Sequence, residues 1–302
     1  MERFWSFAAC IAIAIAATGA FAEDSGTLGK IREKNAIVLG VRDASIPFSF
    51  LDENQAAVGY SVDLCNRVAE AVKRELKLAA LEVRTQVVTS ANRIPLIANG
   101  TVDLECGSTV NNIERQRLVA FSLTTFLVNT KFIAKKASAI RGIQDLKGKT
   151  VVVTAGTNTL QKVNAINAQQ GLGMTILQGK DHPESFMFVE TGRAVAFAED
   201  DILLAGLAAN SKTPDGFALV GIDGMAADPY ALMLRRDDPQ FKRLVDAALA
   251  AVFASGEIYA LYDKWFAKPI PPRRIVLNFP ASEQWKRIVA KPTDSGDPKD
   301  YR

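Results

Sequence analysis

The feature that most constrains the fold is an alternation of short apolar segments with longer amphipathic segments, which occurs in two successive blocks. Short apolar runs are typical of strands, whereas apolar residues three and four positions apart, such as Cys65, Val68 and Val72, indicate a helix. The first block predicts strands at 36–42, 81–88 and 102–104 and helices at 61–76 and 91–100; the second predicts strands at 150–156, 173–179 and 194–200 and helices at 158–170, 183–192 and 201–210. This order predicts an α/β fold with mainly parallel sheets covered by helices.

The part of the chain after the second block has a different character. Two further helices are predicted at 238–255 and 256–266. From residue 268 onward the sequence is rich in proline and charge, and we expect this tail to pack loosely over the first unit. Its last ten or so residues are expected to be disordered.

The first 22 residues have the organisation of a secretory signal peptide. Arg3 precedes an apolar run from about Phe7 to Ala17, and Ala20–Ala22 fits the small-residue cleavage pattern before Glu23. The run is shorter than the roughly 20 residues that span a bilayer, and Cys10 lies too early in it for a lipoprotein anchor. We therefore expect cleavage after residue 22 and a soluble, periplasmic mature protein.

Charge and composition exclude several classes of partner. The formal net charge of +3 is too small to favour nucleic acid, and the single histidine, His182, argues against a histidine-rich metal site. No cofactor is expected. An oxidising compartment would allow Cys65 and Cys106 to form a disulfide, but their predicted places on a helix and at a strand end fit two buried thiols equally well. The sequence leaves this alternative open.

The candidate functional residues lie in loops that follow the predicted strands. In an open parallel sheet, ligands bind beyond the carboxyl ends of the strands, which selects the loops after Val41, Val88, Leu104, Val153 and Phe197. These loops contain Arg42, Ser90, Arg93, Ser108, Thr109, Arg115, Thr154, Thr157 and Asp200.

The chemistry of these residues indicates a small zwitterion with an additional negative charge. An arginine presents a planar fork that holds a carboxylate through two parallel hydrogen bonds, and three arginines are present. Gly156 and Thr157 lie at a strand-to-helix turn, where free backbone N–H groups favour an anion. Asp200 is the one acid in the set and is suited to an ammonium group.

Each residue also has a plainer interpretation. Asp200 is placed to cap the helix that follows it, and Arg42 on its own is typical of a surface residue. Ser108 and Thr109 are suited to closing a turn, and His182 to a solvated loop before a helix. The functional interpretation rests on the coincidence that these residues fall together in the predicted ligand loops.

Several longer segments resemble a known family. The chain contains, in this order, "TSANRIPLIANGTVDLECGSTVNNIERQ", "DLKGKTVVVTAGT", "KDHPESF", "GRAVAFAEDDILLAG" and "KWFAKPIPP". Together they resemble the periplasmic amino-acid-binding proteins of ABC transporters (bacterial solute-binding protein family 3), over nearly the whole mature chain. "TSANRIP", "STVNNIERQ" and "KDH" are narrower and resemble the branch that binds glutamate and aspartate.

The resemblance implies a two-lobed fold (type II) and a transport role. Residues 23–130 and 229–302 would form a discontinuous first lobe and residues 131–228 the second, with hinge strands near 129–132 and 228–233. A monomer would close its lobes over an acidic amino acid and deliver it to a membrane permease.

The resemblance also implies roles for individual residues. Arg115 would clamp the ligand α-carboxylate, helped by Thr109 and the turn at Thr157, while Ser108 and Asp200 would hold the α-amino group. The side-chain carboxylate would be held by Arg42, Ser90, Arg93 and His182. Asn158 stands where the family has a second threonine, and its amide can still donate a hydrogen bond.

Two other classes of function are weighed against this one. Periplasmic dehydratases that act on prephenate or arogenate resemble these binding proteins, and such an enzyme would need an acid in the cleft, for which Glu105, Glu114 and Glu199 are the candidates. A sensor ectodomain is disfavoured because no membrane helix follows in the sequence. The sequence does not rank glutamate against aspartate.

Overall fold

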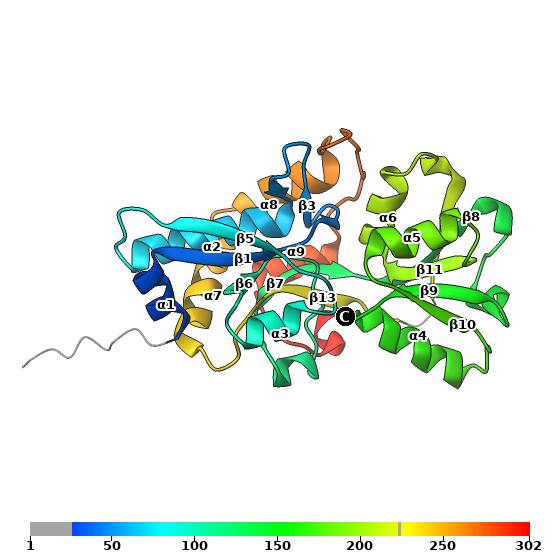
Figure 1. Cartoon of the computed structure of the whole chain (residues 1–302), viewed down its shortest axis with the longest axis horizontal. Helices are drawn as coiled ribbons and strands as arrows, with labels where there is room; N and C mark the ends of the chain where they lie inside the picture. The colour runs from blue at the N-terminus through cyan, green and yellow to red at the C-terminus, as the bar shows by residue number, and fades with distance from the viewer. Residues whose placement is uncertain (1–25, 223–224) are drawn as a thin grey trace, which may run out of the picture.

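The computed structural model describes residues 26–222 and 225–302, so the predicted signal peptide and its cleavage site lie outside the described residues. Two five-stranded sheets lie in separate halves of the molecule, each with its own helices (Figure 1). The long axis of the molecule runs from one half to the other. In the described part of the chain, no single helix is long and apolar enough to span a bilayer, and the segments Pro239–Ala254 and Glu257–Ala267 meet that test only as a pair bent by 86°.

The first sheet has the strand order β5-β1-β6-β13-β7. β1 is parallel to β5 and β6, and β13 is antiparallel to β6 and β7, so four of the five strands run in one direction. The bounds are β1 Ala36–Val41, β5 Glu82–Val87, β6 Leu104–Glu105, β7 Ala120–Val128 and β13 Asp228–Leu234.

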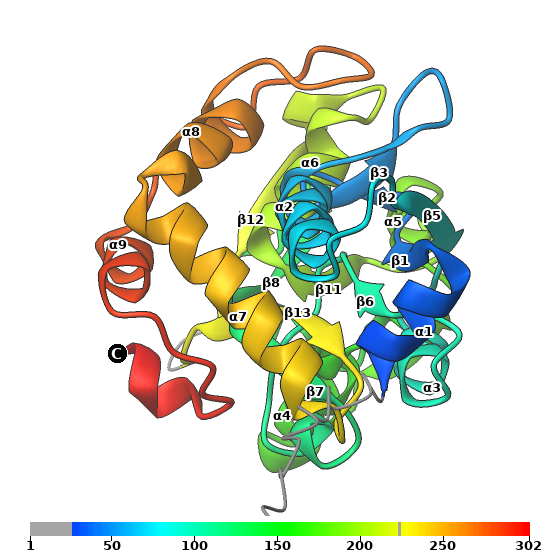
Figure 2. The ribbon, with the colours of Figure 1, turned by 90° about the vertical axis from the view of Figure 1, so that its left-hand side faces the viewer.

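Helices cover both faces of the first sheet. The side chains of Cys65, Val68 and Val72 are fully buried on α2, which packs beside α7 in the larger apolar core (Figure 2). The opposite face is covered by α3, whose Ile97 lies in a separate apolar cluster. The bounds are α1 Thr27–Lys34, α2 Tyr60–Glu75, α3 Arg93–Ala98, α7 Pro239–Ala254 and α8 Glu257–Tyr262.

The second sheet repeats this plan with the order β10-β9-β11-β8-β12, in which β8 alone runs against the other four strands. Val151 and Val153 of β9 face α4, whereas Val152 between them faces α5 and α6. The bounds are β8 Thr130–Lys135, β9 Thr150–Thr154, β10 Thr175–Gly179, β11 Ala196–Asp200 and β12 Phe217–Val220, with α4 Asn158–Gln169, α5 His182–Glu190 and α6 Asp201–Ala209. The predicted mainly parallel sheets are thus confirmed, with one reversed strand in each.

The chain passes directly from one sheet to the other. β7 ends at Val128 in the first sheet and β8 begins at Thr130 in the second, so Asn129 alone separates them. The return lies between β12 and β13. Asn129 therefore lies at the junction of the two halves. Its backbone N–H donates to Asp201 Oδ1 at 3.2 Å.

The loop after β1 forms a small antiparallel sheet of β2 (Ala44–Ser45), β3 (Ser49–Leu51) and β4 (Ala57–Val58). Close to it, Cys65 on α2 and Cys106 after β6 are joined by a disulfide. This settles the alternative that the sequence left open. The bond ties the strand end that carries Ser108 to the main helix of the first half, and closing a loop of this length typically contributes roughly 3–4 kcal/mol.

The prediction of a loose, disordered C-terminal tail was wrong. Residues Glu283–Ala290 form α9, and a short 3₁₀ helix spans Pro298–Tyr301. The Trp285 side chain is 1% exposed and that of Tyr301 3% exposed. These aromatic side chains, together with Ile288 and Val289, hold the charged, proline-rich segment against the first half, because each aromatic ring buries a large apolar area.

Candidate ligand-binding site

A small cavity lies between the two halves, where the strand ends of both sheets meet; we call it the central cavity. Its volume is about 10 Å³, close to the minimum that holds one water molecule. An amino acid could therefore enter this cavity only if the two halves moved apart. The cavity is lined by Ser90, Arg93, Ser108, Val110 and Arg115 from the first half and by Thr157, Asn158, Thr159, His182, Glu199 and Asp200 from the second.

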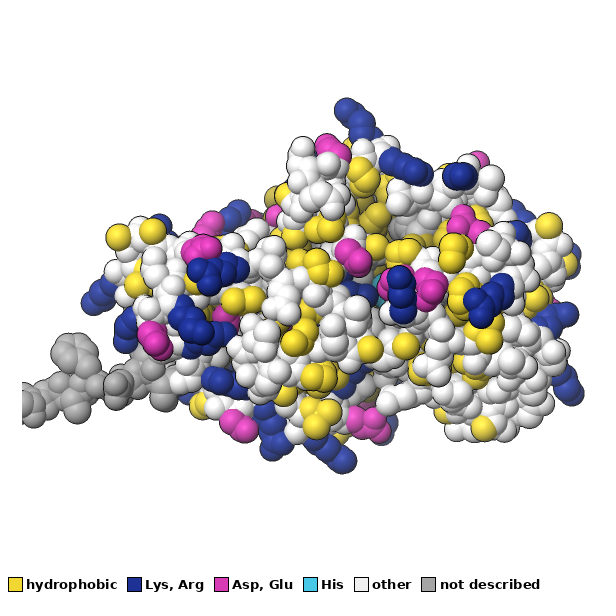
Figure 3. Space-filling model, viewed as in Figure 1, with side chains coloured by type: hydrophobic (Ala, Val, Ile, Leu, Met, Phe, Trp, Pro, Cys, Tyr) yellow, Lys and Arg dark blue, Asp and Glu magenta, His cyan; other side chains and the backbone are white. Residues whose placement is uncertain are grey.

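The two halves touch directly around the central cavity, and Figure 3 shows them meeting along a narrow groove. Asn112 Nδ2 donates to Asn158 Oδ1 at 3.1 Å. Gly156 approaches the first half so closely that a Cβ there would lie 2.6 Å from the Cα of Ala91. A side chain at Gly156 would therefore hold the halves apart.

Eight of the ten predicted site residues line the central cavity; Arg42 and Thr109 do not. Nine of the ten are buried, with Asn158 only partly so. The strand-end rule therefore brought together residues as far apart in the sequence as Ser90 and Asp200, about 110 positions. Their roles toward a ligand remain predictions.

Arg115 reaches from the first half to the second. Its Nη1 donates to the carbonyl of Val110 at 2.8 Å and its Nη2 to the carbonyl of Gly156 at 3.2 Å. Burial, followed by the neighbouring charge of Arg93, lowers the pKa of Arg115 to about 10. The guanidinium thus stays charged at neutral pH in a setting where an additional anion would stabilise it.

Arg93 is fixed by groups behind the cavity. Its Nη1 donates to the carbonyl of Ser108 at 3.0 Å and to Thr109 Oγ1 at 2.6 Å. The Thr109 hydroxyl in turn donates to Glu105 Oε2 at 2.6 Å. The hydroxyl of Thr109 is therefore occupied inside the protein, and this side chain positions Arg93 rather than facing the cavity.

Arg42 is 2% exposed, so its plainer interpretation as a surface residue was wrong. Burial, followed by the charge of Arg93, lowers its pKa to about 10. Among the residues that the structure describes, Nε and Nη1 of Arg42 have no hydrogen-bond partner. The same holds for Nε of Arg93 and for the hydroxyls of Ser90 and Ser108. Buried donors are nearly always paired, so this concentration of free donors indicates a place for a ligand rich in acceptors.

Asp200 does not cap the helix that follows it, because its side chain makes no capping hydrogen bond to α6. Its carboxylate instead accepts a hydrogen bond from the Tyr230 hydroxyl and another from Thr130 Oγ1 at 3.5 Å. Burial, followed by the charge of Asp228, raises the pKa of Asp200 to about 7. A bound ammonium group would favour the ionised form.

Thr157 caps helix α4 and also lines the central cavity. Its hydroxyl accepts from the Leu160 N–H at 3.3 Å, as a cap of α4, and donates to the Thr154 carbonyl at 2.8 Å. The hydroxyl is thus occupied in the fold. An anion in the central cavity would therefore be stabilised by the positive N-terminal end of α4, which faces the cavity, and not by the Thr157 hydroxyl.

His182 is 2% exposed, so its interpretation as a solvated loop residue was wrong. It begins α5, after the cap Asp181, and its Nδ1 lies 3.0 Å from Thr154 Oγ1. Burial and the charges of Arg42 and Arg93 hold the pKa of His182 well below its usual value.

The acids proposed for an enzyme lie in different places. Glu114 is exposed, and Glu105 is bonded to Thr109 behind the cavity. Glu199 alone of the three lines the central cavity. Val110 and Thr159, which line the cavity, and Tyr230, which bonds Asp200, were not predicted from the sequence. Thr159 follows the "TAGTN" turn closely enough to have been found, whereas Tyr230 comes from β13, for which the loop rule gives no signal.

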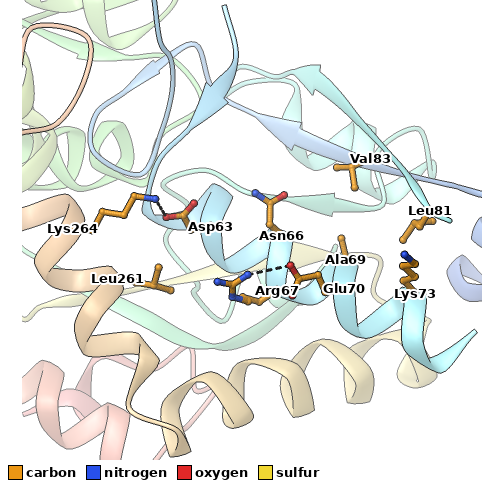
Figure 4. Close-up of a pocket in the computed structure, with 10 residues that line it drawn as sticks. All are labelled: Asp63, Asn66, Arg67, Ala69, Glu70, Lys73, Leu81, Val83, Leu261 and Lys264. Carbon is orange, nitrogen blue, oxygen red and sulfur yellow. Dashed lines mark hydrogen bonds and ion pairs between the residues drawn. The ribbon is translucent and has the colours of Figure 1, made fainter. Parts of the chain in front are cut away.

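A second, larger hollow lies on the outer face of the first half, between α2, β5 and α8, and we call it the surface hollow (Figure 4). It too is lined by charged side chains, but four of these five are bonded to one another: Lys264 pairs with Asp63 at 2.6 Å and Arg67 with Glu70 at 3.1 Å. Within the described ranges, no group of three or more His, Cys, Asp or Glu side chains is arranged to hold a metal ion.

The fold and the central cavity define a class: two α/β halves that enclose a small polar ligand between them. Residues 37–268 match the model of the bacterial extracellular solute-binding proteins, family 3. The chain belongs to this family.

Individual relatives agree with this assignment. The chain is 52% identical to an L-glutamate/L-aspartate-binding protein of Pseudomonas aeruginosa, with 90% of each chain covered. It is 46% identical to the glutamate/aspartate import solute-binding protein of Escherichia coli, covering 95% of this chain and 96% of the relative. Among solved structures, an ancestral amino-acid-binding protein described as a precursor of cyclohexadienyl dehydratase matches with a TM-score of 0.68 and 26% identity, covering 80% of this chain and 99% of that one. The first two relatives favour the solute-binding interpretation over the dehydratase.

Proposed function

We propose that this protein captures glutamate or aspartate in the periplasm by closing two lobes, and that it delivers the amino acid to the permease of an ABC transporter. The observation that carries the proposal is the set of buried, unpartnered donors on Ser90, Arg93 and Ser108, which line the central cavity, and on Arg42, which lies outside the lining. The names of the P. aeruginosa and E. coli relatives support the same ligands.

The two ends of the ligand would be held by different groups. Arg115 and the N-terminal end of α4 would bind the α-carboxylate, and Asp200 with Ser108 would bind the α-amino group. Arg42, Ser90, Arg93 and His182 would bind the side-chain carboxylate, with Arg42 acting from just outside the lining of the cavity.

Discrimination against glutamine follows from the same donors. With a neutral amide in place of the second carboxylate, two buried guanidinium groups would lack an anion, which costs several kcal/mol. We expect glutamine to bind more weakly than glutamate by about 2–4 kcal/mol. A dissociation constant in the micromolar range or tighter, about −8 kcal/mol, is reasonable for a ligand held in this way.

Lobe movement would be concentrated where the chain passes between the sheets. We infer that residues 23–130 with 229–302 form one lobe and residues 131–228 the other, and that a monomer opens at Asn129 and before β13. In the open protein, water would hydrate the arginines; on closure the ligand would replace that water.

A thermal-shift screen of the twenty standard amino acids tests the proposal. Glutamate and aspartate should raise the melting temperature, since a ligand at 100 times its dissociation constant stabilises the folded state by about 2.7 kcal/mol. Calorimetry then ranks the two. If neutral or basic amino acids stabilise the protein and both acidic ones do not, the proposed ligand class is wrong.

A further inference from the structure

Two buried ionisable side chains of the second half face each other at the central cavity. His182 Nδ1 lies 3.4 Å from Glu199 Oε2, and their side chains are each 3% exposed. Glu199 Oε1 accepts from the Asp200 N–H at 3.1 Å and from Thr159 Oγ1 at 3.3 Å. Oε2 makes no hydrogen bond in the part of the chain that the structure describes; the His182 ring lies beside it, with Nδ1 hydrogen-bonded to Thr154 Oγ1 at 3.0 Å. None of the ligand roles implied by the sequence requires a carboxylate here.

The charges around this pair can be counted. The buried charged groups around the pair are three guanidinium groups and two carboxylates, those of Arg42, Arg93, Arg115, Glu105 and Asp200. Without Glu199, these surroundings therefore carry one net positive charge. Lys162 and Asp228 lie next to this group and neutralise each other as an ion pair. Tyr230, which bonds Asp200, is uncharged because burial raises its pKa well above the usual value.

An acidic amino acid carries one net negative charge at neutral pH. The closed complex is therefore electroneutral only if the His182–Glu199 pair is neutral as a whole, which requires one proton on the pair. With no proton on it, the pair would add one uncompensated negative charge beside the two ligand carboxylates in a buried site, and such a charge is strongly disfavoured.

We infer that His182 and Glu199 share one buried proton in the closed protein and that this proton is taken up as the lobes close on an acidic ligand. The inference rests on the proposed function and extends it to a proton balance. The proton can reside on Glu199, donating to Nδ1, or on Nδ1, donating to Glu199. In both arrangements Nε2 keeps its hydrogen and remains a donor for a carboxylate.

Burial gives the direction of the pH effect. It raises the pKa of Glu199 to about 8, with the neighbouring charge of Asp200 as the second cause. When water enters between open lobes, the two groups return toward their ordinary values of 4.5 for glutamic acid and 6.5 for histidine. Below 6.5 the open pair already holds one proton, on the histidine. Between about 6.5 and 8 only the closed pair holds it, so closure takes up a proton and affinity falls as pH rises through this window.

Calorimetry of the full mature chain with glutamate, in buffers of different ionisation enthalpy, measures the proton uptake directly. At about pH 7 we expect the wild type to take up more than about half a proton, and its dissociation constant to rise roughly tenfold between about pH 6 and pH 8.5. Glu199→Gln places a permanent neutral donor beside Nδ1, so this variant should take up no proton, and its affinity should not fall over the same range. The matched control is Glu190→Gln, which removes an exposed carboxylate from the same half and should behave as the wild type.

The outcomes separate the two proposals. If the wild type binds glutamate without taking up a proton, the shared proton is wrong and the proposed function stands. Identical pH profiles for the wild type and Glu199→Gln would also overturn it, as would a change in Glu190→Gln as large as that in Glu199→Gln. If Glu199→Gln fails to bind at every pH, the proton uptake of the wild type still decides. If no acidic amino acid binds the wild type, the proposed function itself fails.

Discussion

The central cavity and the surface hollow are both lined by arginines and carboxylates, yet they differ in how those groups are paired. The surface hollow is the larger, at about 400 Å³ against 10 Å³. Its Arg67 donates to Glu257 at 2.7 Å, and this bond is the main cause that raises the pKa of Arg67. At the central cavity, burial lowers the pKa of Arg115, and it does the same for Arg42 just outside the lining.

This difference shows why neither size nor charge alone identifies a binding site. In the surface hollow four of the five charged side chains already have protein partners, so a ligand would have to compete with existing ion pairs. In the central cavity, buried donors have no partner in the described residues, and a ligand would supply the missing hydrogen-bond acceptors. The comparison predicts that mutations in the two places have opposite consequences for affinity and stability.

The largest effect is expected for Arg115→Ala. It removes the bond across to the Gly156 carbonyl and the proposed clamp on the α-carboxylate, which all amino acids share. Calorimetry should show at least a 100-fold loss of affinity for every amino acid, about 3 kcal/mol or more. If the variant is folded by circular dichroism and binds glutamate within tenfold of the wild type, the clamp has been assigned to the wrong residue.

Arg42→Ala should be the next largest and should be selective. Loss of a buried partner for the side-chain carboxylate is expected to weaken glutamate binding by about 2–4 kcal/mol, roughly 30- to 800-fold. Glutamine, which has no such charge, should lose little, so the ratio of the two affinities reports the role. Arg84→Ala, at an exposed site on β5, is the matched control. Equal losses for glutamate and glutamine would contradict the assignment.

Much of the central cavity could be predicted because its residues follow strand ends, a topological rule that needs no knowledge of packing. The rule found Arg93, Ser108 and Asp200 but could not show that Thr109 faces away from the cavity. That orientation depends on Glu105, which accepts the Thr109 hydroxyl. Contacts of this kind depend on side-chain packing across the sheet, which periodicity does not record.

The direction of β13, which the family resemblance gave only as a hinge strand near 228–233, and the order of the C-terminal tail could not be predicted for related reasons. β13 is buried along its whole length between β6 and β7, and its ladder registers shift near Tyr230. An apolar run of this kind has no periodicity that tells its direction or its neighbours. In the tail, the composition suggested disorder. The Tyr301 hydroxyl, however, donates to the Ser295 carbonyl at 2.6 Å and is hydrogen-bonded to Thr124 Oγ1 of β7 at 2.7 Å. A few specific contacts overrode the average composition.

A smaller effect is expected for Ser90→Ala, which tests the free donors directly. The Ser90 hydroxyl has no partner in the described residues, so the ligand-free variant should melt at the wild-type temperature. Affinity for glutamate should fall by about 1–1.5 kcal/mol, roughly tenfold. Ser122 is equally buried, but its hydroxyl accepts from the Leu232 N–H at 3.0 Å. Ser122→Ala should therefore lower the melting temperature and leave affinity unchanged, and the reverse pattern in this pair would contradict the comparison.

The smallest effect on affinity is expected for Arg67→Ala in the surface hollow. Its ion pairs with Glu70 and Glu257 are partly exposed, and such pairs contribute about 0–1 kcal/mol to stability because water screens them. The melting temperature should fall slightly, and the dissociation constant for glutamate should change less than twofold. A loss of affinity of tenfold or more would mean that the surface hollow is coupled to the central cavity through α2 and the Cys65–Cys106 disulfide. The pairing of charges would then no longer separate a binding site from an ordinary charged surface.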